Sequence, residues 1–131
     1  MKHLASARRL GAVITLVSVA ILLNVALNVA LAAAQGAEEG TANFYSDKFQ
    51  GKKLASGERY DKNSLTASHK TLAYGTKVKV TNLDNGKSVV VTVNDRMKKS
   101  NPAVIDVSRK AADELGFVKA GKAKVKLEVE K

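Results

Sequence analysis

Residues 76–94 read TKVKVTNLDNGKSVVVTVN, and this stretch decides the fold class. Two runs rich in β-branched residues, Thr76–Leu83 and Lys87–Asn94, are joined by Asp84-Asn85-Gly86. Asn-Gly between two such runs is the strongest short signal for a β-hairpin, and it predicts a turn in which both residues have positive φ. We therefore predict an antiparallel pair of strands here.

The second run leads directly to a carboxylate. Val89, Val91 and Val93 share one face of the predicted strand, because side chains alternate with a period of two. Asp95 has the same parity, so we expect it to leave the strand end on the side of the core valines. A partly buried carboxylic acid is suited to general acid catalysis. A turn residue that pairs with Arg96 is the structural alternative.

Shorter signals outside the hairpin complete a mainly β pattern. Further strands are predicted at Thr41–Tyr45, Ala103–Val107 and Lys124–Glu130. Ser108 is a good N-cap for a helix over Arg109–Leu115, and Gly116 suits its C′ position. Five or six short strands with one or two short helices indicate a β-barrel.

The stretch 46–71 shows no clean hydrophobic period. A segment of this length without regular elements, inside a compact domain, is usually functional or disordered. It carries Glu58, Asp61 and His69, which favours function. The structural alternatives are a solvated turn in which Asp61 caps the chain locally, and a His69 that is structural or lies at the surface.

Asp106 is a further acidic candidate, between Ile105 and Val107 and just before the helix. We interpret it as a structural residue that holds loop amides or pairs with Arg96 or Arg109, rather than as a catalytic group.

The N-terminal segment differs in composition from the rest of the chain. Residues 1–34 hold 24 hydrophobic residues, with Lys2, Arg8 and Arg9 before the apolar run and small residues at its end. This order is typical of a secretory signal peptide, and the alternative is a retained membrane anchor, since the run is long enough to cross a bilayer. We predict a linker at residues 35–40 and a folded domain at 41–131, exported to the periplasm, the extracellular space or the cell wall.

The composition limits the kinds of functional site and partner that the chain can have. The chain has no Cys, which excludes disulfides, thiolate metal sites and a Cys nucleophile, and its two His residues are too few for a His-rich zinc site. Without residues 1–34, the remaining 19 basic and 12 acidic residues leave a net charge of +7. No stacking aromatics interleave the lysines, so we expect an anionic cell-envelope surface, rather than nucleic acid, as the partner. We expect a monomer.

Several motifs in order resemble one family. They are Ala55-Ser56-Gly57-Glu58-Arg59-Tyr60-Asp61, Leu65-Thr66-Ala67-Ser68-His69-Lys70-Thr71-Leu72, Val80-Thr81-Asn82-Leu83, Val93-Asn94-Asp95-Arg96 and Ile105-Asp106-Val107-Ser108. Over residues 40–130 the chain is similar to the rare lipoprotein A (RlpA-like) family.

That resemblance implies a six-stranded double-psi β-barrel, the fold of expansins and family-45 endoglucanases. It also implies an endolytic lytic transglycosylase that acts on peptidoglycan, preferentially on strands stripped of stem peptides. Cleavage between N-acetylmuramic acid and N-acetylglucosamine leaves a 1,6-anhydro end, because the muramyl 6-hydroxyl attacks its own anomeric carbon. The resemblance implies no metal and no organic cofactor.

The family's acidic cluster carries over onto Glu58, Asp61 and Asp95, with His69 beside them. We expect Asp95 to be the general acid/base, Glu58 and Asp61 to stabilise the developing positive charge and bind sugar hydroxyls, and His69 to orient a carboxylate. Four neighbouring residues are expected to bind substrate, namely Tyr45, Tyr60, Asn94 and Arg96.

The chain departs from the family pattern in places. Phe44-Tyr45-Ser46 stands for Trp-Tyr-Gly, and Met97-Lys98-Lys99 stands for Gly-Pro-Phe, so we expect 97–103 to line the groove differently. A lipid-modified Cys and a sporulation-related repeat domain, found in some relatives, are not expected here. A non-catalytic, expansin-like glycan-binding protein is the alternative function, and a basic envelope adaptor is a second one.

Overall fold

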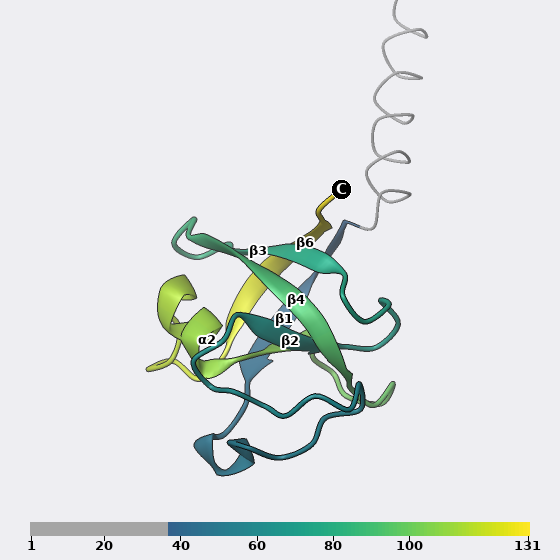
Figure 1. The fold of residues 1–131 in the computed structure, drawn as a ribbon. Helices are drawn as coiled ribbons and strands as arrows, with labels where there is room; N and C mark the ends of the chain where they lie inside the picture. Colours follow the sequence, from purple (N-terminus) through teal and green to yellow (C-terminus); the bar gives the residue numbers. More distant parts are fainter. Residues whose placement is uncertain (1–36) are drawn as a thin grey trace, which may run out of the picture. The chain divides into compact units, whose positions relative to one another are not determined.

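The computed structural model describes residues 37–131, which form a closed six-stranded β-barrel (Figure 1). The strands are β1 (Glu38–Phe44), β2 (Thr66–His69), β3 (Lys77–Asn82), β4 (Ser88–Arg96), β5 (Ile105–Val107) and β6 (Ala123–Val129). Around the barrel they follow the order β1-β5-β2-β4-β3-β6. The predicted six-stranded barrel is confirmed, whereas the predicted signal peptide or anchor lies outside the described residues.

Two of the six pairings are parallel, namely β1 with β5 and β2 with β4, and the other four are antiparallel. Parallel neighbours cannot be joined by a tight turn, so long connections must run between them. Two long connections, residues 45–65 from β1 to β2 and residues 97–104 from β4 to β5, both begin where a strand of a parallel pair ends. That end of the barrel is where the candidate site lies.

The buried core residues follow the two-residue period of the strands. Alternate residues of the strands are fully buried, including Val78 and Val80 on β3, Val91 and Val93 on β4, and Leu127 on β6. Burial of these side chains supplies the main driving force for folding, at about 1.5–3 kcal/mol for each.

Helix α2 (Arg109–Leu115) has the predicted bounds, and it closes one side of the core (Figure 1). Ser108 Oγ accepts from the amide of Ala111 at 3.3 Å, and Gly116 has φ of 77°. At the helix end, the side-chain amides of Asn82 and Asn85 each donate to the carbonyl of Leu115 at 2.9 Å. The hairpin therefore caps the helix through a carbonyl that has no partner within it.

The predicted hairpin is confirmed, but its turn differs from the predicted type. Gly86 has φ of 76°, whereas no non-glycine residue in the described chain has positive φ. Asn85 instead uses its side chain, whose oxygen accepts from the amide of Lys87 at 2.9 Å while its amide caps α2. The connection between β3 and β4 is longer than a two-residue Asn-Gly turn, and this length lets the Asn85 side chain reach both partners.

Two boundaries also differ from the prediction. β1 begins at Glu38, so the last three residues of the predicted linker are strand. Gly40 is required there, because a Cβ would lie 2.4 Å from Cγ1 of Val104. β2 lies inside the stretch predicted to lack regular elements. It was not predicted because its sequence, Thr-Ala-Ser-His, carries no large apolar residue.

Among residues 37–131, no helix reaches the length and hydrophobicity needed to cross a membrane.

Candidate functional site

Four polar residues form one row across four adjacent strands. Asn43 on β1 is paired with Asp106 on β5, Asp106 with Ser68 on β2, and Ser68 with Asp95 on β4. The next row, on the core side, contains Val107, Ala67 and Val93. Side chains of adjacent rows point to opposite faces, so the polar row faces away from the core.

A register shift places Asp95 in this row. Ala67 pairs with Val93 and the next residue, Ser68, pairs with Asp95, which leaves Asn94 as the extra residue of β4. Such a bulge moves every following side chain to the other face. Asp95 therefore does not share the face of the core valines, and the parity prediction was wrong because it assumed an unbroken strand.

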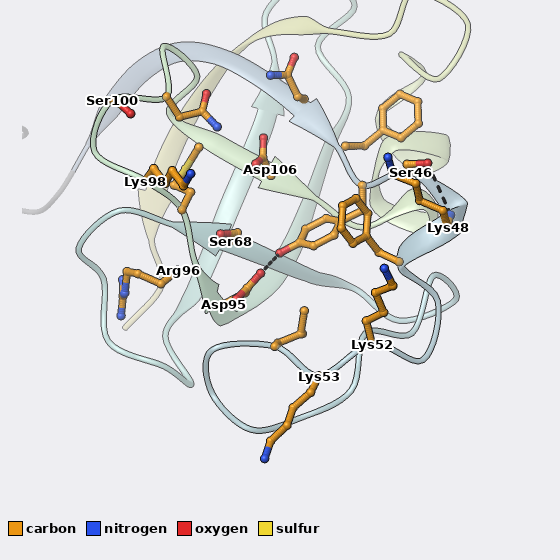
Figure 2. Close-up of a pocket in the computed structure, with 17 residues that line it drawn as sticks. Ser46, Lys48, Lys52, Lys53, Ser68, Asp95, Arg96, Lys98, Ser100 and Asp106 are labelled. Carbon is orange, nitrogen blue, oxygen red and sulfur yellow. Dashed lines mark hydrogen bonds between the residues drawn. The ribbon is translucent and has the colours of Figure 1, made fainter.

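All four residues of the row line a cavity of about 810 Å³ (Figure 2). Phe44, Tyr45 and Phe49 form its aromatic wall, and Phe49 is placed by a short 3-10 helix, η1 (Asp47–Phe49), that follows β1. The opposite wall comes from the segment after β4, with Met97, Lys98, Ser100 and Asn101. This segment lines the cavity, and its difference from the family pattern stays a prediction.

Asp95 is held by one donor on each oxygen. The phenol of Tyr45 donates to Oδ2 at 2.5 Å (Figure 2), and the amide of Ala55 donates to Oδ1 at 2.9 Å. Burial, followed by the hydrogen bond to Asp95, raises the pKa of Tyr45, so the phenol remains a proton donor at neutral pH. The carboxylate is therefore fixed in orientation at the cavity wall.

Asp106 is the second carboxyl of the cavity, and the structure contradicts the interpretation of it as an ion-pair residue. Among residues 37–131 it forms no ion pair with Arg96 or Arg109, and Arg109 instead contacts Asp47 and Asp113. Burial, and then the negative charge of Asp95, raise the pKa of Asp106. The sequence did contain a signal for the position of Asp106. It stands between two buried apolar residues of a strand, so its side chain must point to the face opposite the core.

The remaining predicted catalytic residues do not line the cavity. Glu58 is exposed, and its Oε2 accepts from the side-chain amide of Asn94 at 3.3 Å. Asn94 directly precedes Asp95 in the chain. Asp61 is exposed and caps its own turn, accepting from the amide of Asn63 at 2.9 Å and from Ser64 Oγ at 3.1 Å. These bonds, that of Asn63 first, lower the pKa of Asp61.

His69 is buried at the end of β2 and turns away from the acidic pair. Its Nδ1 accepts from the amides of Thr71 and Leu72, both at 3.1 Å, so the proton must be on Nε2. Nε2 lies 2.9 Å from Oε1 of Glu38. His69 therefore contacts the carboxylate of Glu38, and not one of the acidic cluster beside which it was predicted to lie.

The four predicted substrate-binding residues divide into two groups. Tyr45 and Arg96 line the cavity. Tyr60 is buried beneath Tyr45, with their rings stacked at 4.5 Å, and its hydroxyl accepts from the amide of Arg109. Asn94 is also buried, so Tyr60 and Asn94 support the wall rather than face the cavity.

Arg96 ties the site to the loop between β2 and β3. Its Nη1 donates to the carbonyls of His69 at 3.0 Å and Leu72 at 2.8 Å, and its guanidinium lies 4.7 Å from the ring of Tyr74. It forms no ion pair with Asp95 among the described residues. Within the same residues, no three His, Cys, Asp or Glu side chains are grouped so that they could hold a metal ion.

A match to one protein family model identifies the family of this chain. Residues 37–127 match the family model described as "Lytic transglycolase". The chain belongs to the lytic transglycolase family. It is 53% identical over 89 residues to the endolytic peptidoglycan transglycosylase RlpA of Neisseria meningitidis serogroup A, a match that covers 68% of this chain and 37% of that protein.

The RlpA of Pseudomonas aeruginosa is also 53% identical over 89 residues, with 68% of this chain and 26% of that protein covered. The predicted RlpA-like membership is confirmed, although the chain spans less than two fifths of the length of these two relatives.

Two solved structures share the fold. The apo expansin of Clavibacter michiganensis matches with a TM-score of 0.58 at 23% identity, over 72% of this chain and 50% of that one. The Streptomyces papain inhibitor matches with a TM-score of 0.58 at 20% identity, over 72% of this chain and 94% of that one. The predicted double-psi β-barrel is confirmed.

Proposed function

We propose that this domain is an endolytic lytic transglycosylase that cleaves peptidoglycan between N-acetylmuramic acid and N-acetylglucosamine. The observation that carries the proposal is the presence of two carboxyl groups, Asp95 and Asp106, in one row that faces one cavity. Membership of the lytic transglycolase family supports it. Acid/base catalysis with two carboxyls works when their environments differ, as they do here.

Asp106 is assigned the role of the acid. Burial and the charge of Asp95 favour its protonated form, which can transfer its proton to the glycosidic oxygen. The bond between this oxygen and the anomeric carbon then breaks, and its electron pair stays on the leaving N-acetylglucosamine oxygen. Positive charge develops on the muramyl ring, where the nearby carboxylate of Asp95 stabilises it.

Asp95 is assigned the role of the base. The muramyl 6-hydroxyl attacks the anomeric carbon, and its proton passes to Asp95 as the new bond forms. The product is a 1,6-anhydro end, no water is consumed, and exchange with solvent returns both carboxyls to their starting states. The two groups together perform the acid and base steps that were expected of Asp95 alone.

The other predicted residues are assigned to positioning. Glu58 holds Asn94, the residue that the bulge inserts before Asp95. Asp61 fixes the turn after Tyr60, and His69 fixes the turn on which Arg96 rests. The aromatic wall of Tyr45 and Phe49 suits packing against sugar rings.

We further propose that the substrate is peptide-poor glycan and that the domain acts outside the cytoplasm, where peptidoglycan lies. The cavity walls would accommodate the strand, and no metal is assigned a role.

The test is the turnover of peptide-free glycan strands, with new ends analysed by mass spectrometry. We expect the wild-type chain to produce ends, and Asp95→Asn and Asp106→Asn each to lower the rate by at least about a hundredfold. Both variants should remain folded by circular dichroism. Wild-type rates in both variants would contradict the proposal, and strand binding without any turnover by the wild-type chain would favour the expansin-like alternative.

A further inference from the structure

Four lysines surround the cavity that holds the two catalytic carboxyls. Lys48, Lys52, Lys53 and Lys98 all line it. Within residues 37–131, none of the four forms an ion pair, whereas Lys126 and Arg109 do. We call these four residues the lysine rim.

The lysine rim brackets the acidic pair. Figure 2 shows Lys48 and Lys52 on one side of Asp95 and Asp106, and Lys98 on the other. The ammonium groups of Lys48 and Lys52 each lie 5.5 Å from the centre of the Phe49 ring, within cation–π range. Their positive charges are therefore held beside an aromatic wall.

The four side chains are exposed and solvated, and their combined positive charge favours a ligand of opposite sign in this cavity. A neutral sugar gains little from an ammonium group, whereas a cavity bordered by unpaired charges attracts an oppositely charged ligand. The anion is not expected at the centre, because the carboxylate of Asp95 would repel it. A ligand that suits the cavity therefore carries neutral rings at the centre and negative groups on its flanks.

We infer that the lysine rim binds the lactyl carboxylates that muramic acid residues carry when no stem peptide is attached. The inference rests on the proposed function and identifies the residues that select the substrate. Muramic acid is every second sugar of the strand, so a strand lying across the cavity presents carboxylates on both sides of the bond to be cleaved. An attached stem peptide converts this carboxylate into an amide and removes the charge at that position.

The test measures binding rather than turnover, so it does not depend on catalysis. In the full chain with Asp95→Asn, the variant Lys52→Gln/Lys53→Gln/Lys98→Gln is compared with its parent by calorimetry. One ligand is peptide-free glycan of uniform length, and the other is the same glycan with its carboxylates converted to methyl esters. The control variant, Lys119→Gln/Lys122→Gln/Lys124→Gln, removes the same charge from exposed lysines that do not line the cavity.

We expect the rim variant to bind the free-acid glycan about tenfold more weakly than the parent, at the scale of three exposed ion pairs. Esterification should weaken the parent by a similar factor and the rim variant hardly at all, because the two changes remove the same interaction. The control variant should bind like its parent.

Three results would overturn the inference. One is an equal loss in the control variant, which would indicate attraction by net charge alone. Another is an equal loss for esterified and free-acid glycan in the rim variant. The third is displacement of the glycan by polyglycerol phosphate at equal charge concentration, which would indicate a phosphodiester ligand. Failure of the proposed function appears separately, as carboxylate-dependent binding without turnover by the wild-type chain.

Discussion

The phenol of Tyr45 donates a hydrogen bond of 2.5 Å to Oδ2 of Asp95, which joins residues fifty positions apart in the sequence. The Tyr45 ring stacks on the buried ring of Tyr60, so its hydroxyl is held in place from below. The bond connects the end of β1 to the end of β4 at the cavity wall.

Tyr45→Phe should lower kcat by about 10- to 100-fold, since it removes a hydrogen bond to a charged group, and such a bond is worth about 1.5–3 kcal/mol. The ring and its stacking remain, so the melting temperature should change little. Tyr60→Phe is the matched control, because it removes a buried hydroxyl that contacts the Arg109 amide instead. Turnover of peptide-free glycan measures both variants, and a larger loss of kcat in Tyr60→Phe would contradict the assigned roles.

Asp106→Asn should raise stability at neutral pH while it removes activity. Burial and the charge of Asp95 raise the pKa of Asp106 in the folded protein above its unfolded value of about 3.9. Its contribution to stability is therefore fully present below pH of about 3.9, and is lost as pH rises through the raised pKa. Asn does not ionise, so the variant avoids this loss of stability and should be more stable than the wild type at neutral pH.

Melting curves of wild-type and Asp106→Asn protein from acid to neutral pH check this sign. The advantage of the variant should shrink as pH falls toward the unfolded pKa of Asp. A variant less stable than wild type at neutral pH would show that Asp106 is a structural residue.

His69→Ala should destabilise the domain, because the amides of Thr71 and Leu72 lose their acceptor, at about 1–3 kcal/mol. His69→Asn should fall between the wild type and His69→Ala, since the Asn oxygen can accept from an amide two residues on. Urea denaturation measures the order of stability. If His69→Asn is as stable as wild type and yet inactive, His69 has a direct role in the reaction.

Gly40→Ala should destabilise the barrel by about 1–3 kcal/mol, the usual cost of an overpacked site. The added methyl group would meet Val104 at 2.4 Å, and both residues are held in place by the pairing around β1. Val104→Ala makes room for it, so the double variant should be more stable than the sum of the two single changes indicates. Additive losses would contradict the close approach of these two residues.

The elements that could be predicted are those whose signals are local. The β-branched runs around Gly86 and the caps of α2 are encoded within a few residues, so the hairpin and the helix were predicted correctly. β2 was missed because its burial depends on neighbours from β4 and β5, and its own residues are small and polar.

The site depends even more on distant pairing. Asp95 was predicted to be central, but on the wrong face, because the bulge at Asn94 exists only where β4 meets β2. Asp106 and Asp95 lie in one row only because β2 stands between their strands. Asp61 caps its own turn, as the structural alternative predicted, because its partners lie two and three residues on. The contact of His69 with Glu38 could not be predicted, because the two residues lie 31 positions apart.

The proposed function is tested most directly by digestion of peptide-free glycan strands with the full chain in heavy-oxygen water. Attack by the muramyl 6-hydroxyl excludes solvent oxygen from the product, whereas hydrolysis incorporates it. We predict new anhydro ends, lighter by one water and free of label, and their loss in Asp95→Asn and Asp106→Asn. Labelled reducing ends, or no new ends from the wild-type chain, would contradict it.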